Sequence, residues 1–151
     1  MRSSASRATF LSAVREWLNG DFYEKAFSAE EKEKMLSATV TNAANPDYHT
    51  GGGADTEDMV YLLSAEEAEA LYAFGRDRVS EPTAWCARTW FDIYPGYEKI
   101  MGYWWLRTSG GMAANAAYVG DKGAVNLMGT KANAPLACVR PVITLDATKR
   151  P

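Results

Sequence analysis

The chain has 151 residues, of which 47% are hydrophobic and 23% are charged, and its formal net charge is −3. This composition is typical of one globular domain with a hydrophobic core, and it excludes an intrinsically disordered chain. A small negative net charge gives no general attraction to nucleic acid or to an anionic membrane surface. We therefore expect a single domain spanning residues 1–151 that binds no nucleic acid.

Hydropathy and the start of the chain bear on its location. No apolar run approaches the roughly 20 residues that a membrane-spanning helix requires. Residues 1–7 also lack the apolar core of a signal peptide. These features predict no membrane span. They leave two locations open: the cytoplasm, or a cell surface or virion if this domain belongs to a longer exported protein.

The two cysteines, Cys86 and Cys138, have neither the spacing of metal ligands nor the number that a disulfide framework requires. Free cysteine is among the residues most often buried, so we interpret them as two buried thiols. A single disulfide between them is the alternative, and it requires an oxidising compartment.

Helices are predicted at the start of the chain. Apolar residues recur along one helical face in residues 10–18, and Asn19-Gly20 then predicts the end of that helix. Ser28 with a glutamate three residues later forms a capping box, which predicts a second helix reaching about Leu36.

A long polar segment, residues 43–58, separates two predicted strands at residues 37–42 and 59–63. A loop of this length is unusual in a compact domain, so we expect it to be functional or mobile. Its triple glycine, residues 51–53, lacks the Gly-Lys-Ser/Thr ending of a phosphate-binding loop and is interpreted as flexible. His49, the only histidine, has no neighbours at metal-ligand spacing, so we expect a solvated side chain.

A second capping box, Ser64 with Glu67, predicts a helix through Tyr72. Residues 74–81 form a charged connection, and Pro82 suits the first turn of another helix. The residues of that helix expected to face inward are Trp85, Cys86, Thr89 and Trp90.

The last third of the chain predicts strands. Residues 103–108 form an aromatic and apolar run, and two shorter apolar runs, residues 116–120 and 124–129, are joined by Asp121-Lys122-Gly123. That joint predicts a hairpin whose glycine takes the left-handed position after a type I turn. Residues 138–145 predict a further strand. The order of elements indicates an α+β domain in which N-terminal helices pack on a mainly antiparallel sheet, with a strand–hairpin region at the C-terminal end.

The two faces of the predicted hairpin differ. Strand side chains alternate with period 2, so Ala117 and Val119 share a face, as do Val125 and Leu127 on the partner strand. These apolar sets predict the core side. The opposite face is chemically mixed, which suggests a displayed surface; it carries Tyr118, Gly120, Ala124, Asn126 and Met128.

Two arginines, Arg107 and Arg140, interrupt predicted apolar strands, where an unpaired charge is costly. We interpret each as paired with a carboxylate or with carbonyl groups at the sheet edge. The alternative is that they bind an anionic ligand bidentately.

The sequence offers little support for catalysis. With one histidine, arrangements of Ser-His-Asp or Cys-His type are poorly supported. Acidic residues gather where helices are predicted to start, as the helix dipole favours, and Asp55, Glu57 and Asp58 do not match the spacing of a calcium loop. We expect no catalytic residue, no metal site and no cofactor.

The chain resembles an uncharacterised bacterial domain family whose members carry a Trp-Trp-Leu-Arg-Ser strand and finish on Gly-Val-Arg-Pro. The matching segments here are Trp104-Trp105-Leu106-Arg107-Thr108, Ala116-Ala117-Tyr118-Val119, Asp121-Lys122-Gly123, Val139-Arg140-Pro141, residues 17–23 and Ala26-Phe27-Ser28. The resemblance therefore covers nearly the whole chain.

This resemblance implies a C-type-lectin-like fold, which is also used by formylglycine-generating enzymes and by the variable proteins of diversity-generating retroelements. In those variable proteins a stable scaffold displays diversified positions that bind ligands. Family members often carry asparagine-rich segments where this chain has residues 111–115 and 120–137. Carried over by position, the displayed residues here are Tyr118, Gly120, Ala124, Asn126, Met128, Thr130 and Asn133.

The chain also departs from these patterns. Ala137 and Cys138 stand where the family usually has a glycine before Val139. Adenine changes in an asparagine codon ending in C cannot produce Met or Lys, so Met112, Lys122, Met128 and Lys131 argue against active diversification of this copy. A Glu-Pro-Asn type sugar-binding motif is missing. The paired C-terminal cysteines of formylglycine-generating enzymes are also missing, because Cys138 stands alone in that part of the sequence.

Three functions follow as hypotheses. The preferred one is a non-enzymatic module that recognises a protein or glycan ligand through the hairpin and the loop after it. The alternatives are a structural domain of a larger cell-surface or phage protein and, less favoured, a formylglycine-generating type of enzyme.

Overall fold

The computed structural model describes residues 7–93, 102–135 and 137–149. Its helices are α1 (Arg7–Trp17), the π-helical turn η1 (Leu18–Phe22), α2 (Tyr23–Ala26), α3 (Ala29–Lys32), α4 (Ala65–Leu71), α5 (Gly75–Arg78), α6 (Ala84–Ile93) and the 3-10 turn η2 (Ala147–Lys149). None of these helices is long and apolar enough to cross a membrane.

Among the described residues, the strands form three small antiparallel sheets. Strand β8 (Val142–Leu145) lies between β1 (Met35–Leu36) and β4 (Val60–Tyr61), and β2 (Ala38–Val40) pairs with β3 (Thr56–Asp58). The third sheet has the order β5 (Trp104–Ser109), β6 (Asn115–Val119) and β7 (Val125–Lys131). The predicted α+β class with antiparallel sheets is confirmed.

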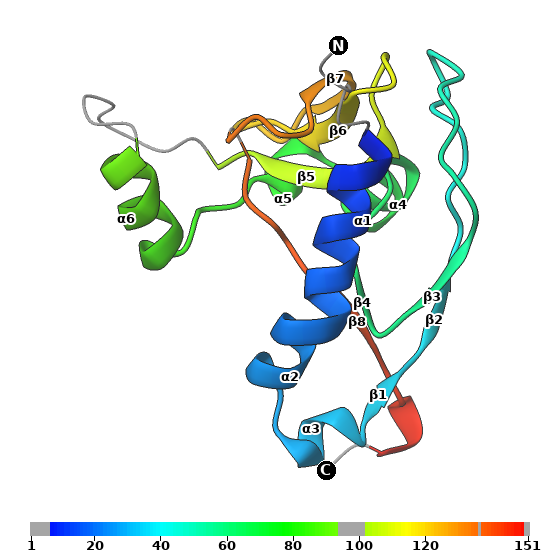
Figure 1. Ribbon diagram of the computed structural model, residues 1–151, viewed down its shortest axis with the longest axis vertical. Coiled ribbons are helices and arrows are strands. Elements are labelled where there is room, and N and C mark those ends of the chain that lie inside the picture. Colours follow the sequence, from blue (N-terminus) through cyan, green and yellow to red (C-terminus); the bar gives the residue numbers. More distant parts are fainter. Residues whose placement is uncertain (1–6, 94–101, 136, 150–151) are drawn as a thin grey trace.

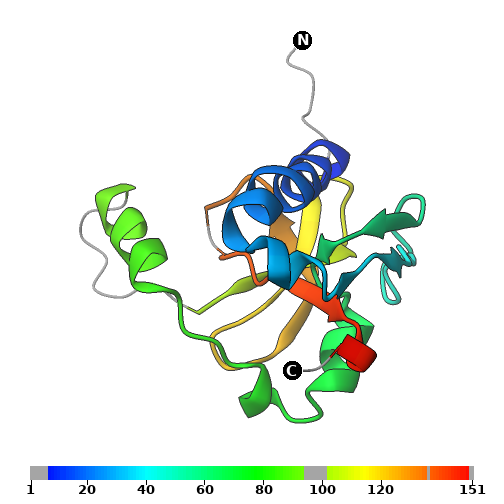
Figure 2. The same ribbon diagram turned by 90° about the horizontal axis from the view of Figure 1, so that it is seen from below.

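Both faces of the β5–β6–β7 sheet are covered. Trp105 and Ala116 share a core cluster with Leu18 of η1. On the other side, Trp104 and Leu106 pack with the α4 residues Ala65 and Ala68, among others. Figure 2 shows α1 above this sheet and α4 below it. Burial of each large side chain contributes about 1.5–3 kcal/mol, so these two clusters hold the sheet between the helices.

The hairpin has the predicted geometry. Ala117 and Val119 are buried in the cluster beside α4, and Val125 and Leu127 pack against it, so the predicted core face is confirmed. The turn glycine, Gly123, has φ of 78°, the left-handed conformation that the turn requires. Both predicted capping boxes are also confirmed, at the starts of α3 and α4.

The predicted stop at Asn19-Gly20 is confirmed: α1 ends at Trp17, the backbone kinks at Gly20, and a separate helical segment, α2, follows. Gly20 adopts a non-helical backbone within η1, with φ of −111° and ψ of −105°. The side chain of Asn19 binds β4: its Oδ1 accepts from the backbone N–H of Val60 at 3.1 Å, and its Nδ2 donates to the carbonyl of the same residue at 2.9 Å. Of the predicted inward residues, Leu18 is buried and Val14 packs against the same core cluster, whereas Trp17 is 44% exposed. The side chain of Phe10 lies outside the described part.

Other element boundaries differ from the predicted ones, in two places because strands pair there. The second predicted helix ends at Lys32, since Met35 and Leu36 pair with β8. The end of the polar segment 43–58 forms β3 against β2, and the charged connection contains the short helix α5.

Helix α6 forms as predicted, but its inward face is wrong at Trp85, which is 76% exposed. Figures 1 and 2 both show α6 standing apart from the sheets, so this residue has no core to enter. The side chain of Trp90 lies outside the described part.

Candidate functional site

A hollow of about 420 Å³ opens on the mixed face of the β6–β7 hairpin. Of the predicted binding residues, its lining includes Tyr118, Gly120, Ala124, Asn126 and Met128. The aromatic and acidic side chains that complete it are Asp47, Tyr48, Tyr103 and Asp121. The structure thus gathers most of the predicted positions around one concave surface.

Two predicted residues do not line the hollow. Thr130 lies further along β7, opposite Ala116, and is half-buried. Asn133 is exposed in the turn after β7. The position-by-position resemblance therefore marks a longer stretch of chain than the concave surface uses.

Tyr118 and Asn126 form the floor of the hollow. They lie directly opposite each other in the β6–β7 ladder, and Asn126 Nδ2 donates to Tyr118 Oη at 3.0 Å. The backbone N–H of Gly129 donates to Asn126 Oδ1 at 2.9 Å, which fixes the orientation of the amide. These bonds hold two polar groups in place before any ligand arrives, which lowers the entropic cost of binding.

The Tyr118 ring is more engaged than a freely displayed residue. Its centroid lies 5.6 Å from that of Tyr103 and 6.4 Å, edge-on, from that of Trp105. The prediction of a face without packing is therefore wrong at this position. Tyr118 packs its ring against the core and directs its hydroxyl to the hairpin amide.

The second wall of the hollow comes from the polar segment 43–58. Asn45 is fully buried, and its Nδ2 donates to the carbonyls of Ser109 at 2.6 Å and Leu127 at 2.8 Å. Its Oδ1 accepts from the backbone N–H groups of Asp47 at 3.0 Å and Tyr48 at 3.1 Å. This amide therefore anchors the loop on the sheet and brings two side chains to the hollow that sequence reasoning missed.

A glycine allows the two walls to meet. The backbone N–H of Gly111 donates to the carbonyl of Met128 at 2.8 Å. A Cβ at Gly111 would lie 2.6 Å from Met128 Sδ and 3.1 Å from the Tyr48 ring, so a larger residue would push these side chains away. Tyr48 and Met128 stay 43% and 45% exposed and form the apolar rim.

The hollow carries negative charge. Asp47 and Asp121 line it, and no lysine or arginine is among its described lining residues. Burial, the negative charge of Asp121 and the neighbouring Tyr118 together raise the pKa of Tyr103. Tyr103 therefore keeps its proton at neutral pH and can donate a hydrogen bond. Such a surface suits neutral polar groups and cations better than anions.

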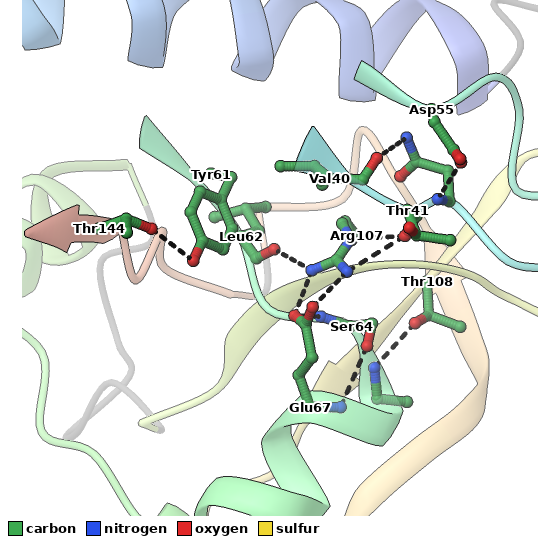
Figure 3. A network of polar contacts seen from close by, with 12 residues as sticks. Val40, Thr41, Asp55, Tyr61, Leu62, Ser64, Glu67, Arg107, Thr108 and Thr144 are labelled. Carbon is green, nitrogen blue, oxygen red and sulfur yellow. Dashed lines mark hydrogen bonds and ion pairs between the residues drawn. The ribbon is translucent and has the colours of Figure 1, made fainter. Parts of the chain in front are cut away.

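Arg107 has the structural role preferred from the sequence (Figure 3). Its guanidinium forms a bidentate ion pair with Glu67 and donates to the carbonyls of Leu62 at 2.8 Å and Thr41 at 3.1 Å. Burial alone would raise the pKa of Glu67, but hydrogen bonds from Arg107 and from the backbone of Ser64, with the arginine charge, lower it. The carboxylate thus caps α4 and pairs with Arg107 at once.

Arg140 is held by aromatic rings instead of the predicted carboxylate or carbonyls. Its guanidinium carbon lies 4.8 Å from the Trp104 ring centroid and 5.0 Å from that of Tyr72. Its Nη2 donates to Tyr72 Oη at 3.3 Å, while Nη1 is buried without a hydrogen-bond partner among the described residues. Cation–π contact with two rings is the interaction that holds this charge in the partly buried site.

A smaller hollow of about 240 Å³ lies beside α1 and the β2–β3 pair. Its charged lining residues are already engaged: Arg15 pairs with Asp58 at 2.6 Å, and Arg107 pairs with Glu67. The rest of its wall is largely apolar, with Leu18 and Val40 among the lining residues. The hairpin hollow, with more polar groups at its surface, is the better candidate for a site.

The acidic cluster near β3 is also engaged in the fold. Asp58 accepts from Thr56 at 2.6 Å as well as from Arg15, and Asp55 accepts from the backbone N–H of Asn42 at 2.9 Å. His49 is exposed with φ of 57°. Within the described residues, no group of three or more His, Cys, Asp or Glu side chains is arranged to hold a metal ion.

A family model described as a domain of unknown function, DUF6273, matches residues 7–147. The chain belongs to the DUF6273 family. The resemblance to an uncharacterised domain family is thereby confirmed for nearly the whole chain. No curated protein and no solved structure matches this DUF6273 chain.

Proposed function

We propose that this DUF6273 domain is a non-enzymatic ligand-binding module whose contact surface is the hollow between the β6–β7 hairpin and residues 45–50. The observation that carries the proposal is the convergence of Tyr118, Asn126 and Met128 with Tyr48, from a distant loop, around about 420 Å³ of concave space. Binding sites are commonly concave, with apolar walls and a few fixed polar groups. Tyrosine and asparagine supply contact area and hydrogen bonds with little conformational freedom to lose.

The ligand class follows from the lining. Tyr48 and Tyr103 offer ring surface for an apolar or cationic group, Tyr118 contributes its hydroxyl, and Asn126 and the two aspartates offer oxygen acceptors. The carboxylates disfavour anions. We propose a glycan without acidic sugars, or a basic segment of a protein, as the ligand.

The fold and context are part of the same proposal. We propose a C-type-lectin-like domain related to the variable proteins of diversity-generating retroelements, acting at a cell surface or in a virion. Support comes from the sequence resemblance and from the α+β arrangement, in which a C-terminal hairpin carries the hollow. A structural domain of a larger surface or phage protein remains the competing function.

The experiment is a glycan and surface-protein array probed with the purified 151-residue chain. Ala124 is exposed at the hollow, so Ala124→Arg would place a long, positively charged side chain in it. Ala113→Arg, at an exposed position that does not line the hollow, is the matched control. We expect the affinity of the first variant for the captured array component to fall tenfold or more, about 1.4 kcal/mol. The control variant should keep the wild-type affinity.

Side-chain truncation provides a second pair. Met128→Ala shortens the rim, and Met112→Ala shortens a methionine that is 60% exposed away from the hollow. Only the first should weaken capture, and both should unfold at nearly the wild-type urea concentration. If no array component binds, or if both arginine variants bind as well as wild type, the structural-domain reading replaces this proposal.

A further inference from the structure

The two cysteines meet in space although 52 positions separate them in sequence. The Sγ atoms of Cys86 and Cys138 lie 2.7 Å apart, and both residues are only partly buried. Two unbonded sulfur atoms do not pack this closely, because their van der Waals shells would overlap. Both cysteines are free thiols in the structure, as interpreted, but they are half-buried and adjacent instead of buried apart. Their approach favours the alternative of a pair.

The two partners differ in how firmly they are held. Cys138 is bound to the sheet edge on both sides: its N–H donates to the carbonyl of Tyr103 at 2.8 Å, and its carbonyl accepts from Trp105 at 3.0 Å. Cys86 lies in the first turn of α6, the helix that stands apart from the sheets in both ribbon views. A covalent bond here would connect a fixed sheet edge to a weakly packed helix.

We propose that Cys86 and Cys138 form an intramolecular disulfide that fastens α6 to the β5 edge of the main sheet. The oxidant is an organic disulfide, which reacts by thiol–disulfide exchange. One cysteine thiolate attacks the oxidant and releases one thiol, leaving a mixed disulfide. The second cysteine then displaces the other half, so one S–S bond forms, one breaks, and both protons and both electrons leave with two thiol molecules.

The local environment decides the resting state of the reduced pair. Burial, the hydrogen bond with Cys86 and the negative charge of a Cys86 thiolate together raise the pKa of Cys138 to about 12. Cys138 therefore carries its proton near neutral pH. Because α6 stands apart from the sheets and contributes no lining residue to the hairpin hollow, reduction would loosen the helix while leaving the hollow intact. The proposal can therefore fail separately from the ligand-binding one.

The direct test uses the whole chain, incubated with glutathione disulfide or with a reducing agent, then denatured and alkylated. We expect the oxidised chain to take up no alkyl group and to yield one cross-linked peptide pair containing Cys86 and Cys138. The reduced chain should take up two. Two alkylatable thiols after oxidation, two glutathione adducts, or a disulfide between chains would each overturn the proposal. This test uses only the wild-type chain, so it does not depend on whether a variant folds.

Limited trypsin digestion tests the tether. Arg88 is exposed in α6, and Arg76 is exposed in α5 as an internal control. We expect cleavage after Arg88 to be about tenfold slower in the oxidised chain, with cleavage after Arg76 unchanged, because local opening exposes the bond to protease. The Cys86→Ser and Cys138→Ser variants should be cleaved after Arg88 at the rate of the reduced wild-type chain, with or without oxidant. Equal Arg88 cleavage in oxidised and reduced wild type would overturn the tether.

Discussion

Asn45 donates its side-chain Nδ2 to the carbonyl oxygen of Leu127, 82 positions away in sequence, over 2.8 Å. This one buried amide joins the loop that carries Tyr48 to the strand that carries Asn126 and Met128. The hollow exists because these two segments meet. Its geometry therefore depends on a residue that has no ligand contact of its own.

The first prediction concerns this anchor. Asn45→Ala removes both donor bonds and leaves the carbonyls of Ser109 and Leu127 without their partner in a buried region. We expect a loss of about 1–3 kcal/mol of unfolding free energy, measured by urea denaturation, together with loss of ligand capture. Asn133→Ala, at an exposed asparagine, should stay within about 0.5 kcal/mol of wild type. Equal midpoints for the two variants would contradict the anchoring role.

The second prediction concerns the hairpin turn. Gly123 has φ of 78°, and a Cβ there would lie 1.7 Å from the carbonyl oxygen of Gly75 in α5. Gly123→Ala should therefore lower the unfolding free energy by about 2 kcal/mol or more. Gly51→Ala is the control, because a Cβ at that position meets nothing within 4 Å. Thermal unfolding of both variants measures the difference, and an unchanged Gly123→Ala midpoint would show that the turn can move away from α5.

Local chemistry made much of the fold predictable. The capping boxes at Ser28 and Ser64 and the left-handed turn at Gly123 are set by neighbouring residues, so short sequence patterns suffice for them. The core side of the hairpin follows from strand alternation. The boundaries that failed, such as the end of the second helix near Met35, depend on pairing with a strand about a hundred residues later.

The site was predictable on one wall only. Period-2 alternation isolates Tyr118 and Asn126, because they share one face of the hairpin on paired strands. Nothing in the sequence around Asn45 indicates that its amide is buried under β7, so Asp47 and Tyr48 were missed. The Cys86–Cys138 approach was hidden for the same reason, since contacts between distant segments leave no local pattern.

The third prediction concerns the acidity of the hollow. Burial raises the pKa of Tyr103 most, and the Asp121 carboxylate adds to it. Asp121→Asn should therefore lower the Tyr103 pKa part of the way towards an ordinary tyrosine, because the burial remains. The measurement is an NMR titration of ring-labelled tyrosine, with the signal assigned by Tyr103→Phe. A Tyr103 pKa that does not move in Asp121→Asn would mean that this carboxylate does not act on the phenol.

The last prediction concerns Glu67 and pH. Its pKa is lowered in the folded protein because the stabilising contacts to Arg107 and to the Ser64 backbone outweigh burial. A depressed carboxyl pKa gives stability that is fully present above the pKa of the unfolded chain and is lost as the pH falls through the folded value. Glu67→Gln can still cap α4, since glutamine also serves in a capping box, but it carries no charge to pair with Arg107.

We therefore expect Glu67→Gln to be less stable than wild type at neutral pH, and the difference between their urea midpoints to narrow as the solution is acidified. Glu69→Gln, at an exposed carboxylate on the same helix, should follow the wild-type profile throughout. A gap between wild type and Glu67→Gln that stays constant across the acid range would show that the lost interaction is packing or geometry. In that case the Arg107 charge would not be what holds α4 to β5.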